Sequence, residues 1–168
     1  GSTIDALPLA DRISMSNMTI EAGGKFGLFP ADKTVEEYLN GRVKGKYTAV
    51  SADKDASYLD TYEYDAAEIP PTVAEPFLPE NAKPAIDFIH VDIDQAYLGS
   101  CTNGRIEDLR IAAEILKGNT VKEPIRFIIV PASTDVYQQA MNEGLLDIFI
   151  KAGGFISGPT CGACLGGY

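Results

Sequence analysis

The chain has 168 residues, enough for one domain with a buried core, and 45% hydrophobic with 23% charged residues is typical of a folded globular protein. Its 24 acidic residues against 14 basic ones give a formal charge of −10, which argues against nucleic acid or an anionic membrane surface as the main partner. No apolar run approaches the roughly 18 residues that a transmembrane helix needs, so we expect no membrane partner.

The chain begins with a dipeptide, Gly1-Ser2, that is typical of an expression scar. We expect residues 3–168 to form one domain fragment of a longer protein, in which residues 3–86 are a helical and irregular covering part. Within this part, mixed apolar spacing over residues 10–24 predicts a short helix that ends near Gly23.

Two weaker patterns follow in the covering part. Thr34 and Glu37 have the spacing of a capping box, which predicts a short helix ending at Asn40-Gly41. Residues 62–64 alternate tyrosine with an acidic residue, as in a half-exposed strand, before prolines interrupt any regular pairing.

The second half, residues 87–168, has clearer periodicity. Its strand-like runs and its helical repeats alternate along the chain: strands at 88–91 and 96–98, a helix at 106–116, a strand at 125–130, helical turns between 134 and 149, and a strand at 155–157. This β-α-β-α-β order predicts an α/β fold with a doubly wound, mainly parallel sheet and right-handed crossovers.

All three cysteines, Cys101, Cys161 and Cys164, come shortly after predicted strands. In an open parallel sheet that position is the carboxyl edge, where ligands bind. Three thiols cannot all pair within one chain and no secretory signal is present, so we expect a cytoplasmic protein without a disulfide framework. Neighbouring glycines allow the backbone to approach a bulky inorganic centre closely.

Several kinds of site are compatible with these thiols. A bare Cys-x-x-Cys occurs in zinc sites, redox pairs and iron–sulfur sites, and three buried cytosolic thiols need have no function. A Cys₃His zinc site would need His90, which the predicted strand places on a sheet face as a packed histidine. A thioredoxin-like pair leaves Cys101 unexplained, whereas a cluster held by three thiolates uses all three cysteines.

Two long motifs contain the cysteines, and a third motif lies near the start of the chain. Residues 97–105 (YLGSCTNGR) and 158–167 (GPTCGACLGG) resemble the two cluster-binding signatures of the aconitase superfamily, and residues 16–24 (SNMTIEAGG) are similar to a further family motif. Within the superfamily, the resemblance is closest to the large subunits of isopropylmalate dehydratases and their homoaconitase relatives.

The resemblance implies a [4Fe–4S] cluster held by Cys101, Cys161 and Cys164, with one iron that has no cysteine ligand. It also implies a hydro-lyase that isomerises 2-isopropylmalate and 3-isopropylmalate in leucine biosynthesis, or a related hydroxy acid, by dehydration and rehydration. Asn17 and Glu21 match family residues beside the cluster and its bound water, and their i,i+4 spacing predicts a shared helical face.

The implied partners are a small hydroxy-di- or tricarboxylic acid as substrate and a small subunit that carries the swivelling domain. That domain contributes a serine base and arginines in this family. Family residues expected before and after this region are absent, so we expect a truncated cluster-binding domain that is inactive alone. A non-catalytic metal or redox-sensing module that uses the same three thiols remains the alternative from another class.

Overall fold

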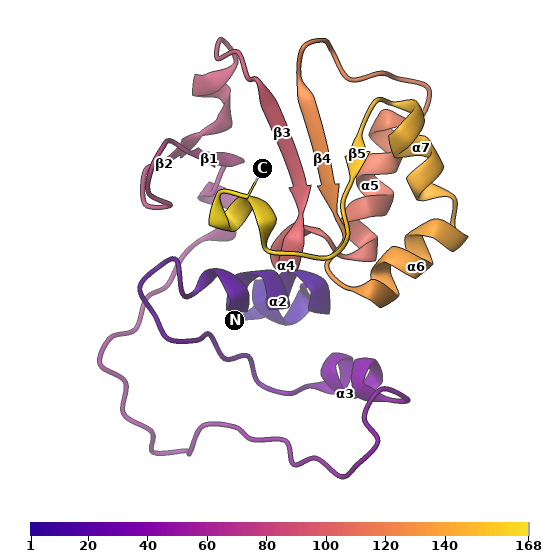
Figure 1. Ribbon diagram of the computed structural model, residues 1–168. Coiled ribbons are helices and arrows are strands. Elements are labelled where there is room, and N and C mark those ends of the chain that lie inside the picture. Colours follow the sequence, from indigo (N-terminus) through magenta and orange to yellow (C-terminus); the bar gives the residue numbers. More distant parts are fainter. Residues whose placement is uncertain (168) are drawn as a thin grey trace. The chain divides into compact units, whose positions relative to one another are not determined.

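The computed structural model describes residues 1–167, except for the side chain of Ala163 (Figure 1). The chain divides into two compact units, Gly1–His90 and the part from Val91 onward. None of the helices in the described residues combines the length and the apolar character that crossing a bilayer requires.

The first unit contains three short helices and one small antiparallel hairpin. Its elements are α1 (Ser2–Ala6), α2 (Leu9–Met18), α3 (Lys33–Leu39), η1 (Ala66–Glu68), β1 (Thr72–Ala74), β2 (Ala82–Pro84) and η2 (Ala85–Phe88).

The two helices predicted in this unit exist, but their ends differ from the prediction. Helix α2 stops at Met18 rather than near Gly23, because the Thr19 amide bonds back to Ser16 and the chain continues as turns. Helix α3 is capped by Asp32, whose carboxylate accepts a hydrogen bond from the Val35 amide, so the predicted capping box is wrong. Two cap-competent residues stood close together in the sequence, and the earlier one is used.

Two predicted strands are absent from the described residues. Tyr62 and Tyr64 lie in irregular chain and are 72% and 79% exposed, because alternation alone supplies no partner strand. Residues 88–91 are not a strand either: η2 ends at Phe88, and an exposed His90 follows in a turn. The expectation of a packed histidine on a sheet face is therefore wrong.

The second unit is an α/β arrangement around a parallel sheet, as the sequence predicted. Its elements are β3 (Gln95–Gly99), α4 (Ser100–Asn103), α5 (Ile106–Leu116), β4 (Arg126–Val130), α6 (Thr134–Asn142), α7 (Leu145–Lys151), β5 (Phe155–Ile156) and η3 (Gly162–Leu165). The strand order is β3-β4-β5, and both neighbouring pairs are parallel.

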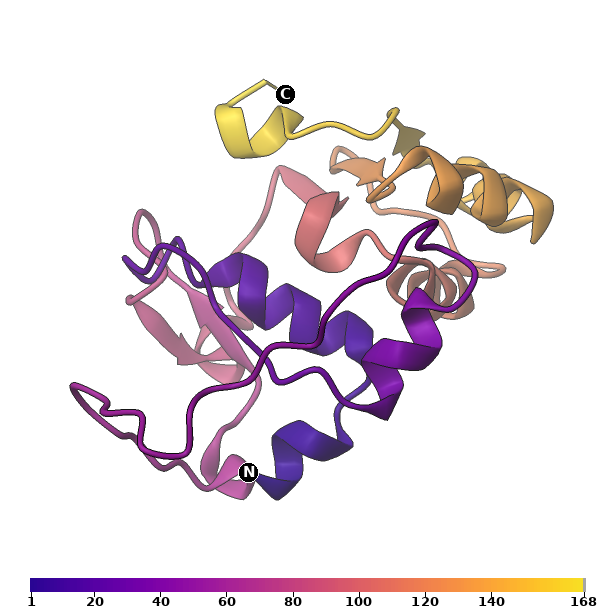
Figure 2. The ribbon, with the colours of Figure 1, turned by 90° about the horizontal axis from the view of Figure 1, so that it is seen from below.

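Helices α5, α6 and α7 share one apolar core and lie on the same side of this sheet (Figures 1 and 2). Leu109 and Phe149 of the helices are fully buried there, together with Ile129 of β4. In register with Ile129, Leu98 of β3 and Ile156 of β5 pack against the same core. The helix layer thus packs against all three strands of the sheet.

Candidate functional site: the cysteine edge of the sheet

Cys101 is the second residue of α4 and lies in a tight turn of the chain, residues 99–104, that follows β3. Gly99 has φ 138° and the buried Ser100, the first residue of α4, has φ 60°, so the chain turns sharply just before Cys101. Gly104 closes the turn: a Cβ there would be 2.5 Å from the Val130 carbonyl oxygen and 2.6 Å from that of Ser100. The turn therefore packs directly on the end of β4, and only residues without a side chain fit at its closest approach.

The carboxylate of Asp108 ties this turn to α5. Asp108 accepts a hydrogen bond from the Arg105 amide at 3.0 Å and one from the Asn103 side chain at 3.3 Å. An acidic residue at the third helical position was the signal in the sequence, because such residues commonly bond back to the amide of the cap.

The Cys161–Cys164 pair lies in a separate local scaffold beyond β5. The Ser157 amide makes a hydrogen bond to the Ile129 carbonyl at 2.9 Å, and η3 follows. The Cys164 amide donates to the Cys161 carbonyl at 2.7 Å, and the Gly162 amide donates to the Thr160 hydroxyl at 3.1 Å. Both thiols of the pair are therefore carried by one short turn.

The two cysteine regions belong to the same edge of the sheet. Because β3 and β5 are both parallel to β4, their carboxyl ends lie at one edge, and Cys101 and Cys161 follow those ends. Figures 1 and 2 show the segment after β5 running back toward the side of β3. The positions of Cys101 and Cys161 after strands of a parallel sheet are thus as the sequence predicted.

The chemistry of the donor set fits a thiolate-bound metal centre. The three cysteines are exposed and form no disulfide. Within the part of the chain that the structure describes, no group of three or more His, Cys, Asp or Glu side chains is already gathered around one point. Exposed thiols at one sheet edge match the ligands of iron–sulfur clusters.

The other two predicted site residues, Asn17 and Glu21, belong to the first unit. Asn17 lies in the last turn of α2 and is partly exposed, and Glu21 is exposed in the turns that follow. Because α2 ends at Met18, the predicted shared helical face does not form.

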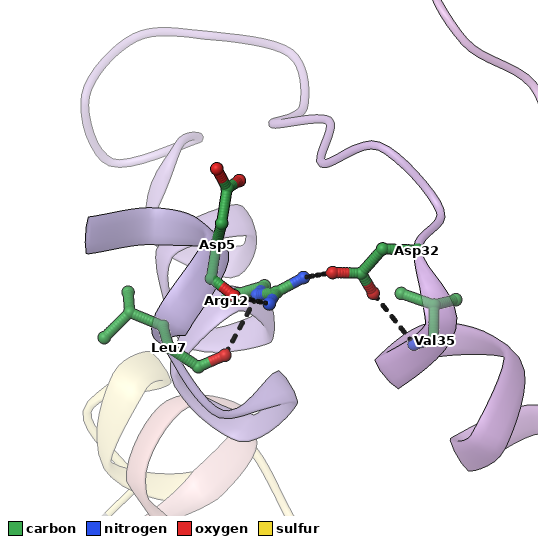
Figure 3. A network of polar contacts seen from close by, with 5 residues as sticks. All are labelled: Asp5, Leu7, Arg12, Asp32 and Val35. Carbon is green, nitrogen blue, oxygen red and sulfur yellow. Dashed lines mark hydrogen bonds and ion pairs between the residues drawn. The ribbon is translucent and has the colours of Figure 1, made fainter. Parts of the chain in front are cut away.

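A buried cation anchors the helix that carries Asn17 (Figure 3). Arg12 of α2 is 4% exposed and donates to the carbonyls of Asp5 and Leu7 and, at 2.6 Å, to the carboxylate of Asp32. This hydrogen bond, with the one from the Val35 amide, holds the pKa of Asp32 below its ordinary value. The contact joins positions far apart in the sequence, and no local pattern indicated it.

Comparisons with known proteins agree with the motif resemblance. The model of the aconitase family (aconitate hydratase) matches residues 1–90 and 81–168. The chain is 52% identical over 168 residues to the 3-isopropylmalate dehydratase large subunit of Thermodesulfovibrio yellowstonii, 51% to that of Desulfitobacterium hafniense and 52% to that of Hydrogenobaculum sp.. Each alignment includes all of this chain and 40% of the relative, so the chain spans well under half the length of these relatives. The chain belongs to the aconitase family.

Proposed function

We propose that the chain is part of the large subunit of a 3-isopropylmalate dehydratase, a hydro-lyase that interconverts 2-isopropylmalate and 3-isopropylmalate in leucine biosynthesis. The observation that carries the proposal is the position of Cys101 after β3 and of Cys161 and Cys164 after β5, at one edge of one parallel sheet. Identity of 52% over the whole chain to a large subunit of that name supports the same function.

Cys101, Cys161 and Cys164 are the residues that would hold a [4Fe–4S] cluster with one iron free of cysteine ligands. When bound, such a cluster supplies a Lewis acid for the hydroxyl that leaves and returns. Three thiolates at the sheet edge are enough to hold the cluster and leave that position accessible.

The chain's own polar residues would handle the substrate and the proton. Glu21 offers an exposed carboxylate that can accept or return a proton, and Asn17 offers an amide that can orient a polar partner. Arg105, beside the Cys101 turn, supplies local positive charge in a chain of net charge −10. A guanidinium is a suitable partner for a substrate carboxylate, and Arg105 is partly exposed.

The remaining parts of the proposal concern the setting of the site. The partners are a small hydroxy-di- or tricarboxylic acid and a small subunit with the swivelling domain, and the location is the cytoplasm. Residues 3–86 form the covering part and residues 87–168 the cluster-binding part of one domain. In the complete protein, further elements would make the sheet doubly wound.

Anaerobic reconstitution of the chain with iron and sulfide tests the cluster assignment. We expect broad visible absorption and roughly four iron atoms per chain. Cys161→Ser and Cys164→Ser should each lose both signals, because a thiolate ligand is removed. Thr160→Ser is the matched control, since it lies in the same segment and keeps a hydroxyl for the Gly162 amide. One bound zinc per chain and no iron–sulfur absorption would favour the non-catalytic metal module.

The full-length two-subunit enzyme tests the catalytic assignment. Glu21→Gln keeps the size of the side chain but removes its charge, so we expect kcat to fall about 10²-fold or more while iron content stays unchanged. A rate within about threefold of wild type, far below the effect of a positioned acid–base group, would exclude a catalytic role for Glu21.

A further inference from the structure

The segment that follows α2 folds back onto this helix and is held there by two ties. The first is the ion pair between Arg12 on α2 and Asp32 at the start of α3, with 2.6 Å between guanidinium nitrogen and carboxylate oxygen (Figure 3). The second is a hydrogen bond of 2.6 Å from the Ser16 hydroxyl to the Gly27 carbonyl. Both ties start on α2, the helix that carries Asn17. Glu21 lies in the chain between the end of α2 and the two tied positions, Gly27 and Asp32.

The return path is also fixed by close packing. A Cβ at Gly27 would lie 3.2 Å from the Cα of Ser16 and would collide with the Thr19 hydroxyl. The returning segment therefore packs directly against the C-terminal end of α2. The Gly24 amide donates to the Thr19 carbonyl at 3.0 Å, which closes the turn around Glu21 from the other side. Glu21 is thus an exposed carboxylate on a turn whose two ends are held.

Both partners of the ion pair between Arg12 and Asp32 also make hydrogen bonds to the backbone. Arg12 is 4% exposed, and its other nitrogens donate to the carbonyls of Asp5 and Leu7. These contacts hold the guanidinium in place. Asp32 gives its second oxygen to the Val35 amide, which anchors the far end of the segment to α3. Because both oxygens of the Asp32 carboxylate are bound, this residue fixes the end of the chain segment that follows α2.

We propose that Arg12, Ser16 and Asp32 are positioning residues that fix the turn carrying Glu21, a role that rests on the proposed function of Glu21. The exposed carboxylate has no rigid element of its own, since α2 ends at Met18. The two ties replace that support, and the geometry required of an acid–base group depends on it.

Two mild substitutions in the full-length two-subunit enzyme test this role. Asp32→Asn keeps a side chain that caps α3 and removes the charge that binds Arg12, and Ser16→Ala removes the donor to Gly27. We expect each to lower kcat roughly 10- to 100-fold, the cost of misplacing a reacting group, with iron content and KM unchanged. Asp65→Asn is the matched control, because Asp65 caps η1 in the same way. We expect this substitution to leave kcat unchanged.

A double-substitution cycle separates positioning from general structural damage. If Asp32 acts through Glu21, Asp32→Asn should cause no further loss of kcat in an enzyme that already carries Glu21→Gln. A loss that multiplies with that of Glu21→Gln would overturn the inference and leave the proposed function intact. If Glu21→Gln alone has no effect on the rate, the catalytic assignment of Glu21 fails, and the positioning role fails with it.

Amide exchange in the 168-residue chain gives a readout that does not depend on activity. Asp32→Asn and Ser16→Ala should each speed exchange at residues 20–26, because one tie is released, whereas Asp65→Asn should not. Unchanged exchange in both variants would show that the ties do not hold the turn.

Discussion

Cys101 and the Cys161–Cys164 pair follow strands of the same sheet, yet different forces hold them. The Cys101 turn packs its glycine backbone on the Val130 carbonyl and is tied to α5 through Asp108. The hydrogen bonds from the Cys164 amide to Cys161, from the Gly167 amide to Gly162 and from the Gly162 amide to Thr160 each join two members of residues 158–167. Just before this segment, the Ser157 amide bonds to the Ile129 carbonyl of β4.

This contrast indicates how a three-thiolate site can be built from two unlike halves. The fixed half is the turn of residues 99–104 with Cys101, and the adaptable half is the segment of residues 158–167 with Cys161 and Cys164. The fixed half takes its position from the sheet and the helix layer, so it needs no ligand to define it. The adaptable half keeps its two thiols together through η3, a short element supported by hydrogen bonds inside its own segment. A bound metal centre is a suitable organiser, because ligand binding and local folding are coupled in such sites.

The largest effect is expected from filling the closest approach in the fixed half. Gly99→Ala would place a methyl group against the Val130 carbonyl at a φ of 138°, which side chains rarely adopt. We expect the free energy of unfolding to fall by about 2–6 kcal/mol, the sum of steric overpacking and backbone strain. Urea unfolding of the chain measures it.

Gly158→Ala is the matched control in the adaptable half, since no atom lies within 4 Å of a Cβ there. Its unfolding free energy should stay within about 0.5 kcal/mol of wild type, as for ordinary surface changes. Equal losses in the two alanine variants would mean that both halves are packed alike and would remove the contrast.

Hydrogen exchange measures the same contrast without any substitution. The amides of Tyr97 and Leu98 in β3 should exchange only when the unit unfolds, whereas those of residues 162–167 should open at a cost lower by at least about 2 kcal/mol. Reconstitution with iron and sulfide should raise protection in residues 162–167 much more than in β3. Equal protection of both regions before reconstitution would contradict the division into a fixed and an adaptable half.

The elements that sequence patterns predicted well are those whose signal is local and repeated. The helix predicted at 106–116 is observed as Ile106–Leu116, and the strand predicted at 125–130 as Arg126–Val130, because amphipathic or apolar runs there match a buried position. The strand predicted at 88–91 failed, since a four-residue apolar run is not a strand unless another strand pairs with it.

The candidate site divides in a similar way. Order of strands and spacing of motifs were enough to place Cys101 and Cys161 beyond the ends of parallel strands. The hydrogen bonds of Arg12 to Asp32 and of Ser16 to Gly27 were not predictable, because each joins residues that only the folded chain brings together. Supporting contacts of this kind follow from tertiary packing rather than from periodicity.

A smaller effect is expected from removing one polar support in each half. Asp108→Ala should lower the unfolding free energy by about 1 kcal/mol, because the Arg105 amide at the start of α5 loses its acceptor. Thr160→Val removes the acceptor for the Gly162 amide and should cost less than about 0.5 kcal/mol in global stability, since the segment is exposed. Thermal unfolding of both variants measures this pair, and a larger loss for Thr160→Val would reverse the assignment of the two halves.

The smallest effect concerns the helix layer behind both halves, and it depends on pH. Hydrogen bonds from Arg110 of α5 and from Gln139 of α6 lower the pKa of Glu143 from 4.5 to about 2. A carboxylate with a lowered pKa in the folded state stabilises fully above its unfolded pKa, and this contribution is lost as pH falls from about 4.5 through about 2. Glu143→Gln should therefore be less stable than wild type at neutral pH, and the difference should shrink toward pH 2, by a small amount because both partners are partly exposed. Asp147→Asn removes the same charge together with an exposed ion pair to Lys151 inside α7, so it is the comparison for a pair that does not join two helices. A stability difference for Glu143→Gln that stays constant down to pH 2 would mean that the ion pair does not tie α5 to α6.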